Sequence, residues 1–257
     1  MRLAVCSSKG GVGKTSTAAN LAVVLGRHGR TLVVDADPQD SLGRAFGVVA
    51  KGREDSLAGL LEDPSLDPRT AIREEVAPGV DVLPAHPSLE AVGVALAGQG
   101  GLVSSVRRTL RPLMSTYDHV VLDTHGDLGN LTLASVCAAD AVVSVFTSDP
   151  GSALGVARIA AFLHQHRSFE NTEAVLLGAA CSLWDAQGKA ARDVAGAMEG
   201  IGIPLFQTRI PLSRRVPSST LQKRPVVLSA PSSTVATAYA ALAEEILAAY
   251  SQRGSAA

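Results

Sequence analysis

The 257-residue sequence predicts an α/β protein with a doubly wound, mostly parallel sheet flanked by helices. Apolar, strand-like runs alternate with helical patterns from end to end, which is typical of β-α-β units. Several of these runs, such as residues 141–146, are apolar almost throughout, as expected of strands that are covered on both faces. Right-handed crossovers would place the loops that follow the strands along one edge of the sheet.

The pattern predicts strands and helices in strict alternation. The strands are expected at residues 3–6, 31–34, 80–83, 119–122, 141–146, 174–179 and 205–208. The helices are expected at residues 14–27, 89–97, 102–110, 131–138, 152–166, 190–199 and 233–250. The charged, proline-containing segment 51–78 is expected to be a peripheral excursion with one short helix. We expect residues 1–250 to form a single domain and residues 251–257 a disordered tail.

Composition bounds the class of protein. Apolar residues make up 46% of the chain, enough for a sizeable core, and the net charge of −1 indicates no general affinity for nucleic acid or membranes. The three cysteines, Cys6, Cys137 and Cys181, form no C-x-x-C pair, which favours a reduced, cytoplasmic protein. Neither a signal peptide nor an apolar run long enough to cross a bilayer is expected.

The stretch "SSKGGVGKTS", residues 7–16, lies between a predicted strand and a predicted helix. It matches the phosphate-loop pattern G-x-x-x-x-G-K-[ST] except at the leading glycine, where Ser8 stands, and it carries an additional lysine, Lys9. Glycines let backbone N–H groups turn towards a phosphate, and the helix N-terminus adds its dipole. Lys14 would reach the β- and γ-phosphates, and the Thr15 hydroxyl would bind Mg²⁺.

Carboxylates follow two further predicted strands. Asp35 and Asp37 end the stretch "TLVVDAD", and Asp123 ends "YDHVVLD". Parallel strands share their carboxyl edge, so these side chains are expected beside the phosphate loop. Asp123 would hold Mg²⁺ through water, opposite Thr15.

These motifs resemble those of the ParA/MinD/Soj ATPases, whose deviant Walker A loop is similar to "KGGVGKTS". The family's D-x-D-P-Q motif corresponds to "DADPQ", and its C-terminal I-P-R-N segment is similar to "IPLSRR". The resemblance implies a single P-loop ATPase domain with ATP and Mg²⁺ as cofactors. It also implies that Lys9 reaches across a nucleotide-sandwich dimer to the partner's phosphates, much as an arginine finger acts in trans.

The resemblance also implies residue roles. Nucleotide would be bound by Lys9, Gly10, Gly11, Val12, Gly13, Lys14, Thr15 and Ser16, with Pro211 and Ser213 at the adenine. Metal would be bound by Thr15, Asp35 and Asp123, and the catalytic residues would be Lys9, Lys14 and Asp37, with Asp37 positioning or activating the attacking water.

This chain departs from the family after Asp123, where two prolines are replaced by His125 and Gly126. Losing the prolines frees the segment, and His125 is interpreted as a hydrogen-bonding residue of this switch loop rather than as a catalytic base.

Five cations gather near the C-terminal part of the chain. Because Pro217 and Pro225 interrupt regular structure, they are expected on a basic loop surface: Arg209, Arg214, Arg215, Lys223 and Arg224. Composition alone leaves a solvated basic face and a salt-sensitive DNA surface equally open. The resemblance favours non-specific DNA.

The resulting hypothesis is a ParA-type ATPase with weak intrinsic turnover. It would form an ATP-sandwich homodimer, bind nucleoid DNA non-specifically and segregate plasmids or chromosomes with a ParB-like partner that stimulates hydrolysis. Two alternatives stay open: a positioning ATPase for conjugative transfer machinery or another cargo, and a nucleotide-gated scaffold with negligible turnover.

Other uses of the same loop fit less well. The last predicted helix carries Glu244 and Glu245 and a single cation, Arg253, which argues against membrane attachment. No cysteine lies at a predicted loop tip, which argues against a bridging iron–sulfur cluster. The absence of N-K-x-D argues against a GTPase.

Overall fold

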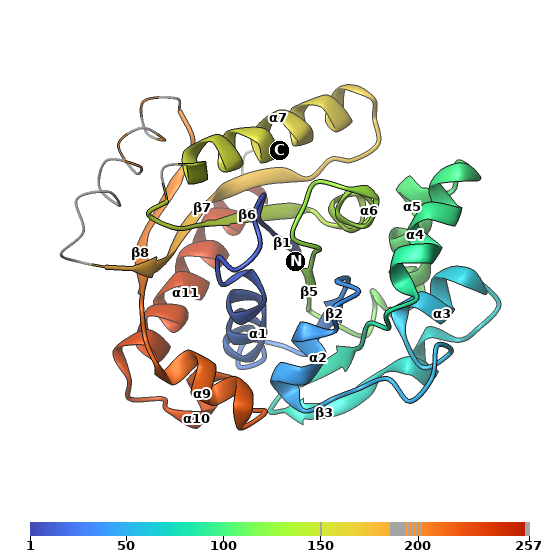
Figure 1. The fold of residues 1–257 in the computed structure, drawn as a ribbon, viewed down its shortest axis with the longest axis horizontal. Coiled ribbons are helices and arrows are strands. Elements are labelled where there is room, and N and C mark those ends of the chain that lie inside the picture. The colour runs from blue at the N-terminus through green and yellow to red at the C-terminus, as the bar shows by residue number, and fades with distance from the viewer. Residues whose placement is uncertain are drawn as a thin grey trace.

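The structure is a computed structural model that describes residues 1–149, 151–185, 194, 196, 198, 200 and 202–254. Within these residues one eight-stranded sheet runs in the order β3-β4-β2-β5-β1-β6-β7-β8, and only β3 is antiparallel to its neighbour (Figure 1). The doubly wound, mostly parallel fold predicted from the sequence is therefore confirmed. The strands are β1 (Arg2–Cys6), β2 (Thr31–Asp35), β3 (Arg73–Ala77), β4 (Val80–Leu83), β5 (His119–Asp123), β6 (Ala141–Phe146), β7 (Val175–Trp184) and β8 (Leu205–Pro211).

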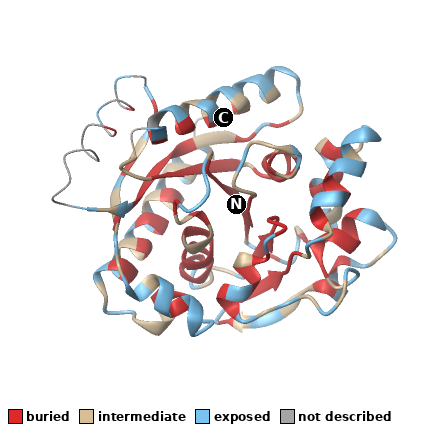
Figure 2. Ribbon diagram, in the orientation of Figure 1, coloured by how far each residue is buried: buried red, intermediate tan, exposed pale blue. Residues whose placement is uncertain are grey.

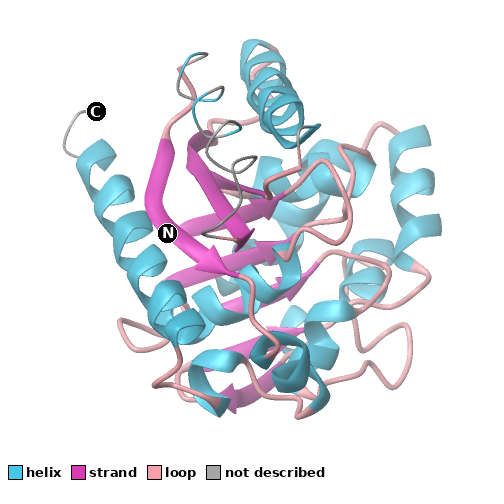
Figure 3. Cartoon of the chain, turned by 60° about the vertical axis from the view of Figure 1, so that its left-hand side comes forward, coloured by secondary structure: helices cyan, strands magenta, loops and turns pink. Residues whose placement is uncertain are grey.

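Helices cover both faces of the sheet (Figure 3). The α-helices are α1 (Lys14–Leu25), α2 (Ser41–Phe46), α3 (Leu57–Glu62), α4 (Leu89–Gly98), α5 (Leu102–Leu110), α6 (Asn130–Ala138), α7 (Gly151–Ser168), α9 (Arg215–Leu221), α10 (Val226–Ser229) and α11 (Thr234–Gly254). Two 3-10 turns lie at Pro68–Ala71 and Arg111–Leu113. One layer contains α1, α10 and α11, and the other contains α4 to α7.

Alternation along each strand divides the core into two halves. In β1, Leu3 and Val5 pack into the layer of α1 and α11, whereas Ala4 and Cys6 pack into the layer of α6. All four residues are fully buried, and Figure 2 shows that the central strands are buried along most of their length. Successive side chains of a strand point to opposite faces, so a strand covered on both sides must be apolar throughout. This is why the central strands are nearly uninterrupted apolar runs.

The helix α11 belongs to the core. Val235, Leu242 and Ile246 are buried against the sheet. Among the described residues, no helix is both long enough and apolar enough to span a bilayer.

The main corrections concern short elements. Segment 51–78 contains, besides the expected short helix α3, the edge strand β3, which the sequence analysis missed. The stretch around Pro217 is the helix α9, not the predicted loop. Pro217 is the third residue of that helix, where its missing N–H would have had no partner within the helix.

Two expectations concern the ends of other elements. The C-terminal helix continues to Gly254, four residues past the predicted limit of 250, and residues 255–257 lie outside the described part. Most of the helix expected at residues 190–199 also lies outside it.

Candidate nucleotide site

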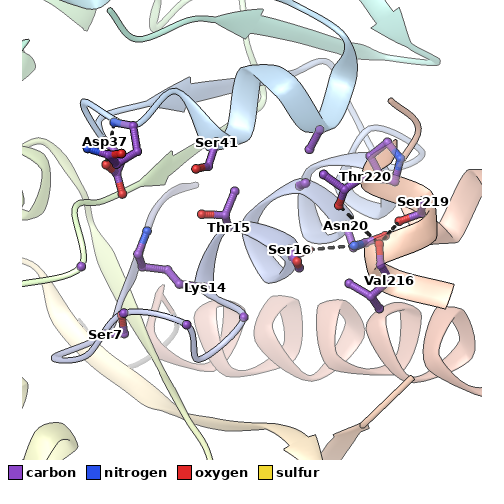
Figure 4. A pocket seen from close by; sticks show the side chains of 18 of the residues that line it. Ser7, Lys14, Thr15, Ser16, Asn20, Asp37, Ser41, Val216, Ser219 and Thr220 are labelled. Carbon is purple, nitrogen blue, oxygen red and sulfur yellow. Dashed lines mark hydrogen bonds between the residues drawn. The ribbon is translucent and has the colours of Figure 1, made fainter. Parts of the chain in front are cut away.

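A cavity of about 410 Å³ opens at the carboxyl edge of the sheet. The sheet order places β1 between β5 and β6, and the loops that follow β1, β2 and β5 border the cavity together with α1 (Figure 4). Of the eight predicted loop residues, all but Val12 line it: Lys9, Gly10, Gly11, Gly13, Lys14, Thr15 and Ser16. The volume lies in the range of small-molecule and cofactor sites.

The loop conformation depends on glycine at two positions. Gly11 and Gly13 have φ angles of 77° and 84°, in the left-handed region that other residues enter only at a cost. From Gly13 the chain enters the twelve-residue helix α1, whose first N–H groups have no partner within the helix. The loop is anchored from below because the Ser182 hydroxyl of β7 donates to the Val12 carbonyl. The loop is therefore fixed in a conformation whose backbone N–H groups can donate to an anion.

At the centre of the site, Lys14 and Asp123 form a buried ion pair. The Lys14 ammonium donates to Asp123 Oδ1 over 2.7 Å, and the two side chains are 7% and 0% exposed. Burial alone would lower the pKa of Lys14, but the charge and hydrogen bond of Asp123, together with the charges of Asp37 and Asp35, outweigh it and raise the pKa. Asp123 Oδ2 is buried, and within the described part of the chain no donor lies at hydrogen-bond geometry to it. Lys14 and one oxygen of Asp123 thus have capacity for an additional ligand.

Asp35 has a role different from the predicted one. Its Oδ1 accepts a hydrogen bond from the Asp37 amide, and its Oδ2 accepts from the amides of Leu42 and Gly43. The carboxylate is fully buried and does not line the cavity. Burial and the charge of Asp123 raise its pKa well above the usual value. Because its oxygens are occupied by backbone donors, Asp35 shapes the loop after β2 rather than facing a metal.

The donor set fits a magnesium–triphosphate group. Asp37 and Asp123 are buried beside one cation, Lys14, which leaves an excess of negative charge that a divalent cation would balance. The unpartnered Asp123 oxygen and the Thr15 hydroxyl are the oxygen ligands that Mg²⁺ prefers, directly or through water. Among the described residues no three His, Cys, Asp or Glu side chains are grouped as a metal site.

The two lysines of the loop face different surroundings. Whereas Lys14 is buried, Lys9 is 62% exposed and donates to Asp149 Oδ2 over 3.1 Å at the rim of the cavity. The partner, Asp149, is itself 42% exposed, and such pairs are weak because water competes for both charges.

The far wall of the cavity is formed by residues that the sequence analysis missed. Pro211 and Ser213, predicted to contact adenine, are not among the lining residues, and Ser213 accepts a hydrogen bond from the Arg215 amide instead. The wall is formed by Val216, Ser219, Thr220 and Pro225, mainly from α9. The available signal was the i, i+3, i+4 spacing of Val216, Ser219 and Thr220, which lies on one side of a short helix once Pro217 is accepted in its first turn.

The five basic residues differ in their exposure and in their contacts. Arg209 is partly buried, and its guanidinium donates to the Phe206 and Gln207 carbonyls and lies 5.9 Å from the centre of the Trp184 ring. The other four are exposed and lie on α9 or directly beside it: Arg214, Arg215, Lys223 and Arg224. The exposed basic surface therefore borders the far wall of the cavity.

The segment after β5 closes the cavity from above. Gly126 lines it, and a Cβ atom added there would lie 3.7 Å from the Gly10 Cα. His125 does not line this cavity but borders a neighbouring hollow together with Asp127. Its Nε2 lies 4.0 Å from Asp37 Oδ1, and its Nδ1 lies 3.1 Å from Asp127 Oδ1.

Comparisons with known proteins identify relatives of this chain. A family model described as an AAA domain matches residues 2–175. The chromosome-partitioning ATPase Soj of Thermus thermophilus is 35% identical over 96% of this chain and 95% of its own length. Among solved structures, apo McdA of Cyanothece, 20% identical, superposes with a TM-score of 0.87 over 95% of this chain and 98% of its own.

A third relative was solved with ligands. The cobyrinic acid a,c-diamide synthase of Mycobacterium smegmatis, with a bound ATP analogue and magnesium, is 26% identical and superposes with a TM-score of 0.83. That superposition covers 97% of this chain and 95% of the enzyme.

Proposed function

Since the chain belongs to the ParA/Soj family of ATPases, with the P-loop fold of that family, we propose that it is a partition ATPase that binds ATP and Mg²⁺ and dimerises around them. The observation that carries the proposal is the contrast between its two loop lysines. Lys14 is buried and faces Asp123 inside the cavity, whereas Lys9 is exposed at its rim. One lysine can therefore serve the chain's own nucleotide while the other is accessible to a second chain.

Hydrolysis would rest on positioning and on neutralising charge. The Lys14 ammonium exchanges the Asp123 carboxylate for phosphate oxygens, which releases Asp123 to hold the water shell of the metal with Thr15. Mg²⁺, held by Thr15 and Asp123 directly or through water, would supply neutralisation of the charge on the phosphates. Asp37 lines the cavity and orients the attacking water, and loop amides from Gly10 to Thr15 hold the phosphates.

The exposed basic surface beside α9 is proposed to bind DNA without sequence preference. Arg214, Arg215, Lys223 and Arg224 can each neutralise a phosphate, and a dimer presents two such sets. A ParB-like partner would accelerate a slow basal turnover, and the protein would be cytoplasmic and associated with the nucleoid.

The central test separates the two lysines. Lys14→Ala should weaken binding of ATPγS·Mg²⁺ on the order of 100-fold in calorimetry, because a charged phosphate contact is lost. Lys9→Ala should leave monomer affinity within about threefold and abolish ATPγS-dependent dimerisation in sedimentation velocity. Lys51→Ala, on the exposed segment after α2, is the matched control. A wild-type protein that stays monomeric with ATPγS at every concentration would contradict the proposal.

Turnover and cargo separate the alternatives. A scaffold would bind ATP and show no hydrolysis even with a partner, whereas a partition ATPase hydrolyses slowly and faster with the partner and DNA. Pull-down of a centromere-bound protein, as opposed to a component of a transfer apparatus, would separate segregation from another positioning task.

A further inference from the structure

His125 lies between two carboxylates on opposite sides of its ring. Its Nδ1 is 3.1 Å from Asp127 Oδ1, and its Nε2 is 4.0 Å from Asp37 Oδ1. Asp37 lines the nucleotide cavity and is 12% exposed, whereas Asp127 faces the outside and is 63% exposed. The imidazole thus joins the surface of the segment after β5 to the carboxylate at the cavity.

Asp127 is held as an acceptor for the imidazole. Its Oδ1 also accepts a hydrogen bond from the Gly129 amide over 2.9 Å, and its carbonyl accepts from the Thr132 hydroxyl over 2.7 Å. A fixed carboxylate acceptor at Nδ1 places the proton of a neutral imidazole on that nitrogen. Nε2 then presents a lone pair towards Asp37, so that two acceptors face the same space.

The distance between these two acceptors suits one bridging water molecule. A separation of 4.0 Å is too long for a hydrogen bond between Nε2 and Asp37 Oδ1. A water with hydrogen bonds of about 2.8 Å to each atom would subtend an angle of about 90°, near the natural angle between its two O–H bonds. Such a water donates both hydrogens and keeps its lone pairs free.

We propose that His125 is a positioning residue for hydrolysis, which holds the attacking water jointly with Asp37 while Asp127 fixes its ring. The proposal rests on the ATPase function argued above. In the reaction, the oxygen of this water bonds to the γ-phosphorus as the bond to the bridging oxygen breaks and its electron pair leaves with ADP. The water's protons pass to inorganic phosphate and solvent, so the imidazole ends as it began.

A purely structural role for His125 and a role in positioning water predict different effects of the same substitutions. If the ring serves only to tie the segment to Asp127, an amide at the position of Nδ1 is sufficient. If Nε2 accepts a hydrogen bond from the attacking water, the replacing side chain must place an acceptor at the position of Nε2. Asparagine places its amide near the Nδ1 position, and glutamine extends its amide to the Nε2 position, so His125→Asn and His125→Gln form a matched pair. His164→Asn, an exposed histidine on α7, is the control.

The kinetic test compares ground state and transition state. His125→Asn should lower kcat about 10- to 100-fold while KM and ATPγS affinity stay within about threefold. Binding of ADP with aluminium fluoride, which imitates the transferring phosphoryl group, should weaken in parallel with kcat. His125→Gln should retain kcat within about fivefold. Wild-type kcat in His125→Asn, equal losses in both variants, or a parallel loss of ATPγS affinity would overturn the proposal.

A second readout needs no nucleotide. Nitrogen-15 NMR of the histidine ring in the nucleotide-free protein should show the proton of His125 on Nδ1, and Asp127→Asn should remove that preference. A ring protonated on Nε2 alone would overturn the role. Absence of any turnover in the wild-type protein would overturn the proposed function and this role with it, whereas normal turnover by His125→Asn overturns the role alone.

Discussion

The carboxylates of Asp37 and Asp123 follow neighbouring strands but have different neighbours. Asp123 is fully buried and bound to Lys14. Asp37 is also mostly buried. Among the described residues its carboxylate accepts one backbone hydrogen bond, from the Gln39 amide, and it borders the cavity. Asp123 thus balances the charge of Lys14, whereas the carboxylate of Asp37 is available to accept a hydrogen bond from a water in the cavity.

Asp37→Ala should separate binding from hydrolysis. ATPγS affinity is expected to stay within about threefold because Lys14 and the loop amides remain, whereas kcat should fall on the order of 100-fold because the water loses its acceptor. Calorimetry and single-turnover hydrolysis measure the two quantities. Asp67→Ala, on an exposed turn, serves as the control. Normal turnover in Asp37→Ala would remove this carboxylate from the mechanism.

The sequence predicted which side chains lie together in the site better than it predicted the direction in which each side chain points. The grouping of Lys14, Thr15 and Asp123 was predictable because the carboxyl ends of parallel strands lie at one edge of the sheet. The direction of the Asp35 side chain was not predictable. It depends on the backbone amides of Leu42 and Gly43, seven and eight residues later, which donate to its carboxylate. Such loop turns are not encoded in a periodic pattern.

Among the elements, α9 connects the two proposed binding surfaces. Val216 and Ser219 line the nucleotide cavity, and Arg215 of the same short helix is exposed. Nucleotide contacts that shift or order this helix would therefore move its cations as one unit. The location of α9 gives a physical reason to expect that the proposed DNA binding depends on nucleotide.

Arg215→Glu should weaken binding of random-sequence DNA in the presence of ATPγS about tenfold, and the slope of log K against log salt should flatten by about one per subunit. Fluorescence anisotropy across a salt series measures both. Arg167→Glu makes the same charge change on α7 and should have no effect. If the two variants bind DNA equally well, the basic surface lies elsewhere.

The elements that the sequence missed share a physical cause. The strand β3 is short, antiparallel and at the edge of the sheet, and it carries Arg73, Glu74 and Glu75, so its composition indicates a solvated loop. The helix α9 was hidden by Pro217. The long central elements were predicted within a few residues because burial on both faces imposes a strong apolar pattern.

For the whole molecule, Asp140 joins segments from opposite ends of the chain. Its carboxylate accepts a hydrogen bond from the Arg2 amide over 3.0 Å, pairs with the Arg2 guanidinium, and accepts from the Tyr250 hydroxyl over 3.2 Å. Burial would raise the pKa of Asp140, but these contacts outweigh it and hold the pKa below the usual value. The first strand and the last helix are thereby tied to one charge.

Asp140→Asn should reduce the free energy of unfolding at pH 7 by about 1–2 kcal/mol, since a partly exposed charged acceptor is lost. A depressed pKa stabilises above the unfolded value and loses that effect as the pH falls through the folded value. The gap between wild type and Asp140→Asn should therefore close below about pH 4. Urea unfolding from pH 7 to pH 3 measures it, with the exposed Glu90→Gln as control. A gap that is independent of pH would contradict this role.

The single tryptophan of the chain, Trp184, ends β7 two residues after Ser182, whose hydroxyl holds the Val12 carbonyl of the phosphate loop. The indole therefore lies about 7 Å along the strand from that anchor. Its emission spectrum is a built-in optical signal beside the loop. Ligand occupancy can be followed in unlabelled protein, in real time, without attaching a dye.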